Sequence, residues 1–211
     1  QAEGMRVRAA VVEEQVAYPT QGRLALEAEG VSVLAIPGPQ DMDAAKAVAL
    51  LLDAIDRDPP QAVLLWNVMP EHKVLIADSL LDIPLYDVSP GEMYFSSLER
   101  WFDRGRAGLP YRSLRDYGRR LAGVIVKYEG ERERARTCLG APVHVIPNGV
   151  PLDEESPRER PKGGPLVIGT AVRLDPRKHV DRLLRALRLA HLRLLPYVLK
   201  IAGGPERGFE A

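Results

Sequence analysis

The chain alternates short apolar runs with longer segments whose apolar residues recur every three or four positions. The runs predict strands at 7–12, 31–37, 62–66, 83–88, 123–127 and 143–146. They are continuous, as in strands that are buried on both faces of a parallel sheet. The periodic segments predict helices at 41–58, which Asp41 can cap, and at 71–81, 90–102, 111–121 and 129–140. This alternation predicts βαβ units in a doubly wound, Rossmann-like α/β domain over residues 1–150.

The pattern breaks at residues 151–164, which are rich in proline, glycine and charge, and therefore read as a linker. It restarts with a strand at 166–171, a helix at 175–195 and a strand at 197–204. Residues 165–211 thus begin a second α/β domain. A single βαβ unit leaves its sheet edges unpaired and buries little surface. We therefore expect residues after Ala211, or another chain, to complete this domain.

Composition excludes several classes of protein. The 211 residues carry no formal net charge, which argues against a nucleic-acid partner. Cys138 is the single cysteine, so no internal disulfide can form and a reducing, cytoplasmic setting is expected. No apolar run reaches the roughly 18 residues of a membrane span. The residues show neither metal-ligand spacing nor a Walker-type glycine loop, so we expect no metal.

Basic residues gather where the helix at 175–195 is expected to begin. Asp175 reads as its N-cap and Pro176 as its first residue, followed by Arg177, Lys178 and His179. A helix N-terminus disfavours cations, so the pattern suggests an anion held by Arg173, Lys178 and free N–H groups, most naturally a phosphate. The alternative is a solvated cluster of small energetic cost, and the further arginines of this helix read mostly as its wet face. That basic face leaves peripheral contact with a membrane open.

Gly203 and Gly204 end the next strand, beside this basic turn. Glycines at a strand end let a ligand approach the backbone closely. An ordinary strand-to-helix turn is the alternative interpretation.

Polar residues also follow two strands of the first domain. Ser89 to Glu92 form an S-x-x-E capping box with proline at the first helical position, so we assign both mainly to capping. His72 and Asp87 remain free to face the crevice, although a lone histidine is more often structural. Cys138 fits a buried helix position better than a nucleophile.

Three segments in this order resemble the GT-B glycosyltransferases, in particular the large retaining family 4 (glycosyltransferase group 1). "GVIVKYEGERERARTCLGAPVHVIPNGVPL" looks like that family's end of the N-terminal domain, "IGTAVRLDPRKHVDRLLRAL" like its R-L-x-x-x-K segment, and "KIAGGPER" like its A-G-x-G-P-E turn, one residue shorter. Together they cover roughly residues 120–207. The resemblance implies two Rossmann-like domains facing a cleft, with the acceptor mainly on the first and a nucleotide-sugar donor mainly on the second.

By position, the resemblance gives Arg173 and Lys178 the donor diphosphate, places Gly203 and Gly204 against the donor, and makes Asn148 and Gly149 the crossing between domains. It implies a hexosyltransferase of carbohydrate biosynthesis that retains configuration and needs no cofactor or metal. The partners would be a nucleotide sugar and a sugar, lipid or small-molecule acceptor. The location would be the cytoplasm, with membrane association on the cytoplasmic face left open.

The sequence also departs from this family. The usual first strand with its glycine-rich loop is missing, and Ser89-Pro90 stands where members carry a histidine, so His72 or Asp87 would serve on the acceptor side. The family's paired glutamates would follow Ala211, so we expect these 211 residues to be inactive alone. A nucleotide-sugar epimerase, a phosphorylase and a non-catalytic nucleotide-sugar-binding module remain alternatives.

Overall fold

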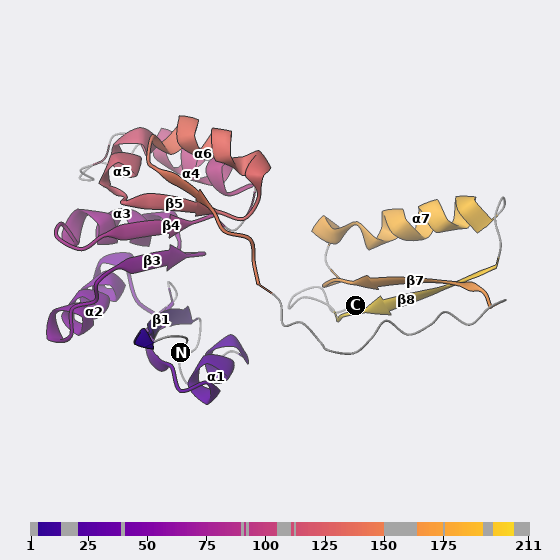
Figure 1. Ribbon diagram of the computed structural model, residues 1–211, viewed down its shortest axis with the longest axis horizontal. Coiled ribbons are helices and arrows are strands. Elements are labelled where there is room, and N and C mark those ends of the chain that lie inside the picture. Colours follow the sequence, from indigo (N-terminus) through magenta and orange to yellow (C-terminus); the bar gives the residue numbers. More distant parts are fainter. Residues whose placement is uncertain are drawn as a thin grey trace. The chain divides into compact units, whose positions relative to one another are not determined.

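The computed structural model describes residues 4–13, 21–38, 41–89, 91, 93–104, 111, 113–149, 164–174, 176–191 and 196–204. The chain forms two compact units, Gln1–Val150 and Pro151–Ala211 (Figure 1). Both are α/β.

The first unit contains a four-stranded parallel sheet and a separate parallel pair of strands. Its elements are β1 (Arg8–Glu13), α1 (Gln21–Ala28), β2 (Ser32–Pro37), α2 (Ala44–Arg57), β3 (Val63–Trp66), α3 (Pro70–Ser79), β4 (Leu85–Val88), α4 (Met93–Asp103), α5 (Leu114–Arg120), β5 (Gly123–Val126), η2 (Glu129–Glu131), α6 (Arg132–Leu139) and β6 (Val143–Val145). The parallel sheet is consistent with the predicted Rossmann-like α/β class.

The four-stranded sheet has the order β3-β4-β5-β6, so each strand lies beside the next one in the sequence. Parallel neighbours require crossover connections, which α3, α4 with α5, and α6 provide. The carboxyl ends of all four strands therefore lie at one edge (Figure 1). Within the described residues, β1 and β2 form their own sheet, so a single doubly wound sheet stays a prediction.

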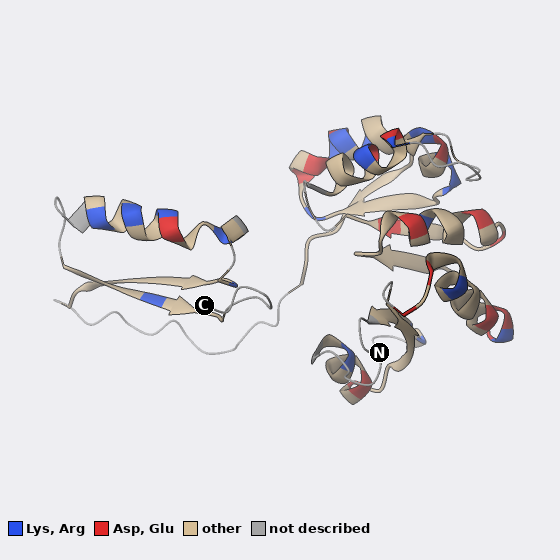
Figure 2. Cartoon of the chain, turned by 180° about the vertical axis from the view of Figure 1, so that it is seen from behind, with Lys and Arg blue, Asp and Glu red and all other residues tan. Residues whose placement is uncertain are grey.

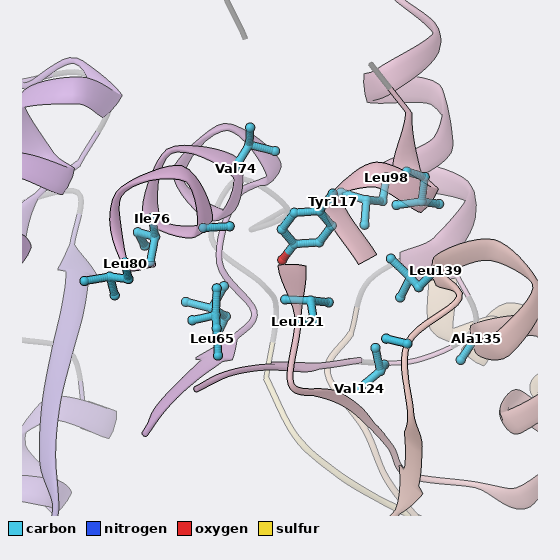
Figure 3. Close-up of a cluster of buried hydrophobic side chains, with 14 of the residues drawn as sticks. Leu65, Val74, Ile76, Leu80, Leu98, Tyr117, Leu121, Val124, Ala135 and Leu139 are labelled. Atoms are coloured by element: carbon cyan, nitrogen blue, oxygen red, sulfur yellow. The ribbon is translucent and has the colours of Figure 1, made fainter. Parts of the chain in front are cut away.

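The core lies between this sheet and its helices. Figure 3 shows Tyr117 of α5 in the middle of a cluster that α3, α4, β5 and α6 also supply. Its labelled members are Leu65, Val74, Ile76, Leu80, Leu98, Tyr117, Leu121, Val124, Ala135 and Leu139. Gly118 allows α5 to approach α6, because a Cβ atom at this position would lie 1.9 Å from the carbonyl oxygen of Leu139.

Three details of the helices differ from the sequence-based predictions. The N-cap of α2 is Asp43, whose carboxylate accepts a hydrogen bond of 2.9 Å from the N–H of Lys46; the prediction of Asp41 was wrong. α4 begins at Met93, three residues later than predicted. α1 was not predicted at all.

The second unit contains β7 (Leu166–Ala171), η3 (Pro176–Lys178), α7 (Val180–His191) and β8 (Tyr197–Ala202). β7 and β8 pair in parallel, as the sequence predicts, and the Tyr197 hydroxyl donates to the carbonyl of Leu187 on α7 over 2.9 Å. None of the described residues between 164 and 204 is buried. Throughout the described chain, no helix combines the length and apolar character needed to cross a membrane.

Candidate functional sites

The carboxyl ends of β7 and β8 are held together beyond the strands themselves. The N–H of Val172 donates to the carbonyl of Ala202 over 3.0 Å, and the N–H of Leu174 donates to Gly204 over 2.9 Å. Gly203 has a φ of 144°, and a Cβ atom there would lie 1.9 Å from the carbonyl oxygen of Val172. The packing of the turn therefore explains Gly203 without a ligand. At Gly204 a Cβ atom would meet open space, so that position can admit a ligand.

The basic residues of this turn precede α7 and are not in its first turn. Pro176 to Lys178 form the 3₁₀ helix η3, and His179 then takes a left-handed φ of 51°. α7 begins at Val180, and its first turn carries Asp181, 3.7 Å from the guanidinium of Arg185. The predicted clash between cations and a helix N-terminus was thus wrong, because the left-handed residue separates the two. Asp175 lies outside the described residues.

Arg173 and Lys178, the predicted diphosphate ligands, are both exposed and follow the carboxyl end of β7. The edge of a parallel sheet at which strands end is the usual place for ligands in α/β proteins. Further basic residues recur along the exposed part of α7 (Figure 2). The turn can therefore attract an anion, and its role toward a diphosphate stays a prediction.

In the first unit, Asp87 is fully buried at the centre of a polar network. Its carboxylate accepts hydrogen bonds from the ammonium of Lys73 and the hydroxyl of Tyr94, and a third of 2.9 Å from the hydroxyl of Tyr117. The Lys73 ammonium also donates to the Tyr94 hydroxyl over 2.8 Å and lies 4.2 Å from the centre of that ring. We call these four side chains the buried network.

The sequence predicts that Asp87 faces an open crevice, whereas the buried network encloses its carboxylate completely. Register places Asp87 between Leu65 of β3 and Val124 of β5, inside the sheet. Burial lowers the pKa of Lys73, while the charge of Asp87 acts to raise it. Burial and the same carboxylate raise the pKa of Tyr94 and of Tyr117 well above their ordinary value. The site therefore holds one ion pair with two neutral phenols.

His72 is also buried, with 6% of its surface exposed. Its Nδ1 atom has no hydrogen-bond partner among the described residues. Burial lowers the pKa of His72, opposed by the charge of Glu71, so the imidazole is neutral at pH 7. A neutral, buried imidazole can accept a proton only after it becomes accessible, so a catalytic role for His72 stays a prediction.

The remaining predicted residues have simpler surroundings. Ser89 is buried, and its hydroxyl oxygen accepts a hydrogen bond of 3.3 Å from the N–H of Gly91; Glu92 lies outside the described residues, so the capping box is untested. Cys138 donates to a Glu99 carboxylate over 3.0 Å, and burial raises the pKa of its thiol, which disfavours a nucleophile. Asn148 and Gly149 are exposed after β6, and their hinge role stays a prediction.

A pocket of about 380 Å³ lies at the carboxyl end of β5, where the sequence-based predictions place no site. It is lined by Phe95, Tyr128, Gly130, Glu131 and Arg134, which we call the β5 pocket. An aromatic residue and glutamates directly after a predicted strand were the available signal. Among the described residues, no group of three or more His, Cys, Asp or Glu side chains could hold a metal.

Comparisons of this chain with protein-family models, with curated proteins and with solved structures give no match.

Proposed function

We propose that this chain belongs to a retaining glycosyltransferase of the GT-B type. The second unit would bind the diphosphate of a nucleotide-sugar donor, and the first would carry the acceptor. The observation that carries the proposal is the turn after β7, where exposed Arg173 and Lys178 flank backbone that is tied to the end of β8. The parallel α/β sheet of the first unit and the three sequence segments support it further.

Glycosyl transfer places negative charge on the departing diphosphate. Fixed cations at the oxygens where this charge develops lower the barrier to the transition state. Arg173 can bind two phosphate oxygens at once, and Lys178 adds a compact point charge. No step in this scheme requires a metal ion. The single cysteine favours a reducing compartment, and we place the activity in the cytoplasm.

Calorimetric titration with UDP, GDP and ADP tests the donor site. Arg173→Ala and Lys178→Ala should each weaken binding by about 10- to 100-fold, since a hydrogen bond to a charged group contributes about 1.5–3 kcal/mol. Arg188→Ala is the matched control: it removes the same charge from an exposed position eight residues along α7, about 12 Å from Val180. Binding that neither variant weakens would refute the proposal.

A non-catalytic nucleotide-sugar-binding module is the second candidate. The observation in its favour is the buried network, in which Asp87 is committed to three donors. The same observation argues against an epimerase, which needs accessible acid and base groups. Nucleotide binding without transfer of the sugar to any acceptor would favour the module.

A further inference from the structure

The β5 pocket lies at the edge of the sheet where the strands of the first unit end. Tyr128, Gly130 and Glu131 follow β5 directly. Phe95 comes from α4 and Arg134 from α6. All five lining residues belong to the first unit, so the pocket can be considered without the second.

Glu131 supplies a polar group that needs a partner. Only 8% of this residue is exposed, and its Oε2 atom is buried without a hydrogen-bond partner among the described residues. A buried acceptor without a donor costs about 1–3 kcal/mol, more when it is charged, and such atoms are rare in native proteins. An incoming molecule that donates a hydrogen bond would remove this cost.

The nearby cations are already engaged. Arg132 pairs with Glu129, with 3.1 Å between Nη2 and Oε2. Arg134 donates to the Ser96 hydroxyl over 2.6 Å and lies 3.7 Å from a Glu99 carboxylate oxygen. Among the described residues no cation is thus left for Glu131, and we expect its donor to come from a bound molecule.

Two aromatic residues line the same pocket as Glu131. Phe95 is fully buried, whereas Tyr128 is 64% exposed although it lines the pocket. At the end of β3, Trp66 is 57% exposed, and the ammonium of Lys127 lies 5.3 Å from its ring centre. Exposed aromatic surface at the ligand-binding edge of a sheet indicates a contact surface.

We propose that the β5 pocket binds a neutral carbohydrate ring. The C–H face of a sugar packs against an aromatic ring, and its hydroxyls donate to a carboxylate such as Glu131. An apolar lining with a few polar groups is typical of small-molecule pockets of this volume. Arg134 also belongs to the lining, and its positive charge disfavours an organic cation as the ligand.

The inference deepens the proposed function in one respect, because it names the acceptor as a sugar. Binding itself needs no nucleotide, so the two ideas can fail separately. Sugar binding that Arg173→Ala and Lys178→Ala leave unchanged would support a carbohydrate site in the β5 pocket. This holds whatever the two variants do to nucleotide binding.

The test is a titration of the full 211-residue chain with glucose, mannose and N-acetylglucosamine, without nucleotide. Amide shifts of Gly130 and Glu131 in ¹H–¹⁵N spectra report occupancy. We expect saturable shifts with at least one sugar. Tyr128→Ala and Glu131→Gln should each weaken binding about tenfold, whereas Glu133→Gln, an exposed neighbour on α6, should leave it unchanged.

The same experiment also checks that the variants are correctly folded. Tyr128 is exposed, so its truncation should leave the spectrum outside the pocket unchanged. Glu131→Gln should retain the melting temperature, because the amide keeps the shape of the side chain and Oε2 has no hydrogen-bond partner among the described residues that could be lost. Saturation by tetramethylammonium in place of the sugars, or sugar shifts that both variants leave intact, would overturn the inference.

Discussion

At the scale of single residues, the carboxylate of Asp87 is held inside the first unit by three donors from three different helices. Lys73 comes from α3, Tyr94 from α4 and Tyr117 from α5. The network therefore fixes the positions of these helices over β4. A buried charge is tolerated only while its partners remain.

Lys73→Met should destabilise the protein by about 3–5 kcal/mol, because it leaves Asp87 buried without its counter-charge. The double variant Lys73→Met/Asp87→Asn should lose less than the sum of the two single variants, since neither charge then remains. Urea denaturation followed by circular dichroism measures both. Strict additivity would show that the two side chains do not act as a pair. Lys46→Met, at an exposed lysine of α2, is the control.

His72 makes stability depend on pH. Its folded pKa lies below the ordinary 6.5, so the unfolded chain takes up the proton first as the pH falls. The contribution to stability is complete above pH 6.5 and is lost as the pH falls through the folded pKa.

His72→Leu should therefore flatten the pH dependence of the free energy of unfolding below pH 6.5, down to the range near pH 4 where carboxylates titrate. Urea titrations of wild type and variant over this range provide the measurement. Parallel curves for the two proteins would contradict the expected role of His72.

At this scale the sequence pointed to Asp87 and His72 but not to their surroundings. Asp87 stands out because it interrupts an apolar strand. Lys73, by contrast, sits in "HKVLIAD" as an ordinary helical lysine. Tyr94 and Tyr117 follow Lys73 by 21 and 44 residues along the chain. Which of them meets Asp87 depends on how α3, α4 and α5 cross the sheet, and a single sequence does not encode those crossings in any local pattern.

At the scale of elements, α5 and α6 depend on one glycine. A Cβ atom at Gly118 would be 1.9 Å from a backbone oxygen of α6, which no side-chain rotation can relieve. Gly118→Ala should lower stability by about 3 kcal/mol or more, as overpacking does when backbone must shift. Thermal denaturation measures this. Gly130→Ala, where a Cβ atom meets nothing within 4 Å, is the matched control and should change little.

The strands were predicted well, and the helix ends less so. The eight strands of the described residues all lie within two residues of their predicted ends, because continuous apolar runs between polar turns are an unambiguous signal. α1 was missed, although the stretch "RLALEA" consists of good helix formers. The left-handed residue at His179 was also missed, because glycine normally marks such a position.

At the scale of the whole molecule, the two units differ in how much they bury. The first contains the core shown in Figure 3, whereas the described residues of the second are all exposed or half-buried. A two-stranded sheet with one helix is marginally stable in water. Stability should therefore be distributed unevenly along the chain.

Hydrogen exchange tests this expectation. Amides of β7 and β8 should exchange at least about 100-fold faster than those of β5, because opening the second unit exposes little apolar surface. Mass spectrometry of peptic fragments, or nuclear magnetic resonance, gives the rates under native conditions. Equal protection of β5 and β7 would show that the second unit is as stable as the first.

The shallow burial of β7, α7 and β8 has a consequence for regulation. A molecule that binds only the folded form of a marginal unit shifts its folding equilibrium, by about 2.7 kcal/mol when its concentration is a hundred times its dissociation constant. For the second unit such a shift could equal its entire intrinsic stability. The lifetime of this segment in the presence of proteases would then follow the concentration of its ligand, so that supply of the ligand would set the abundance of the protein.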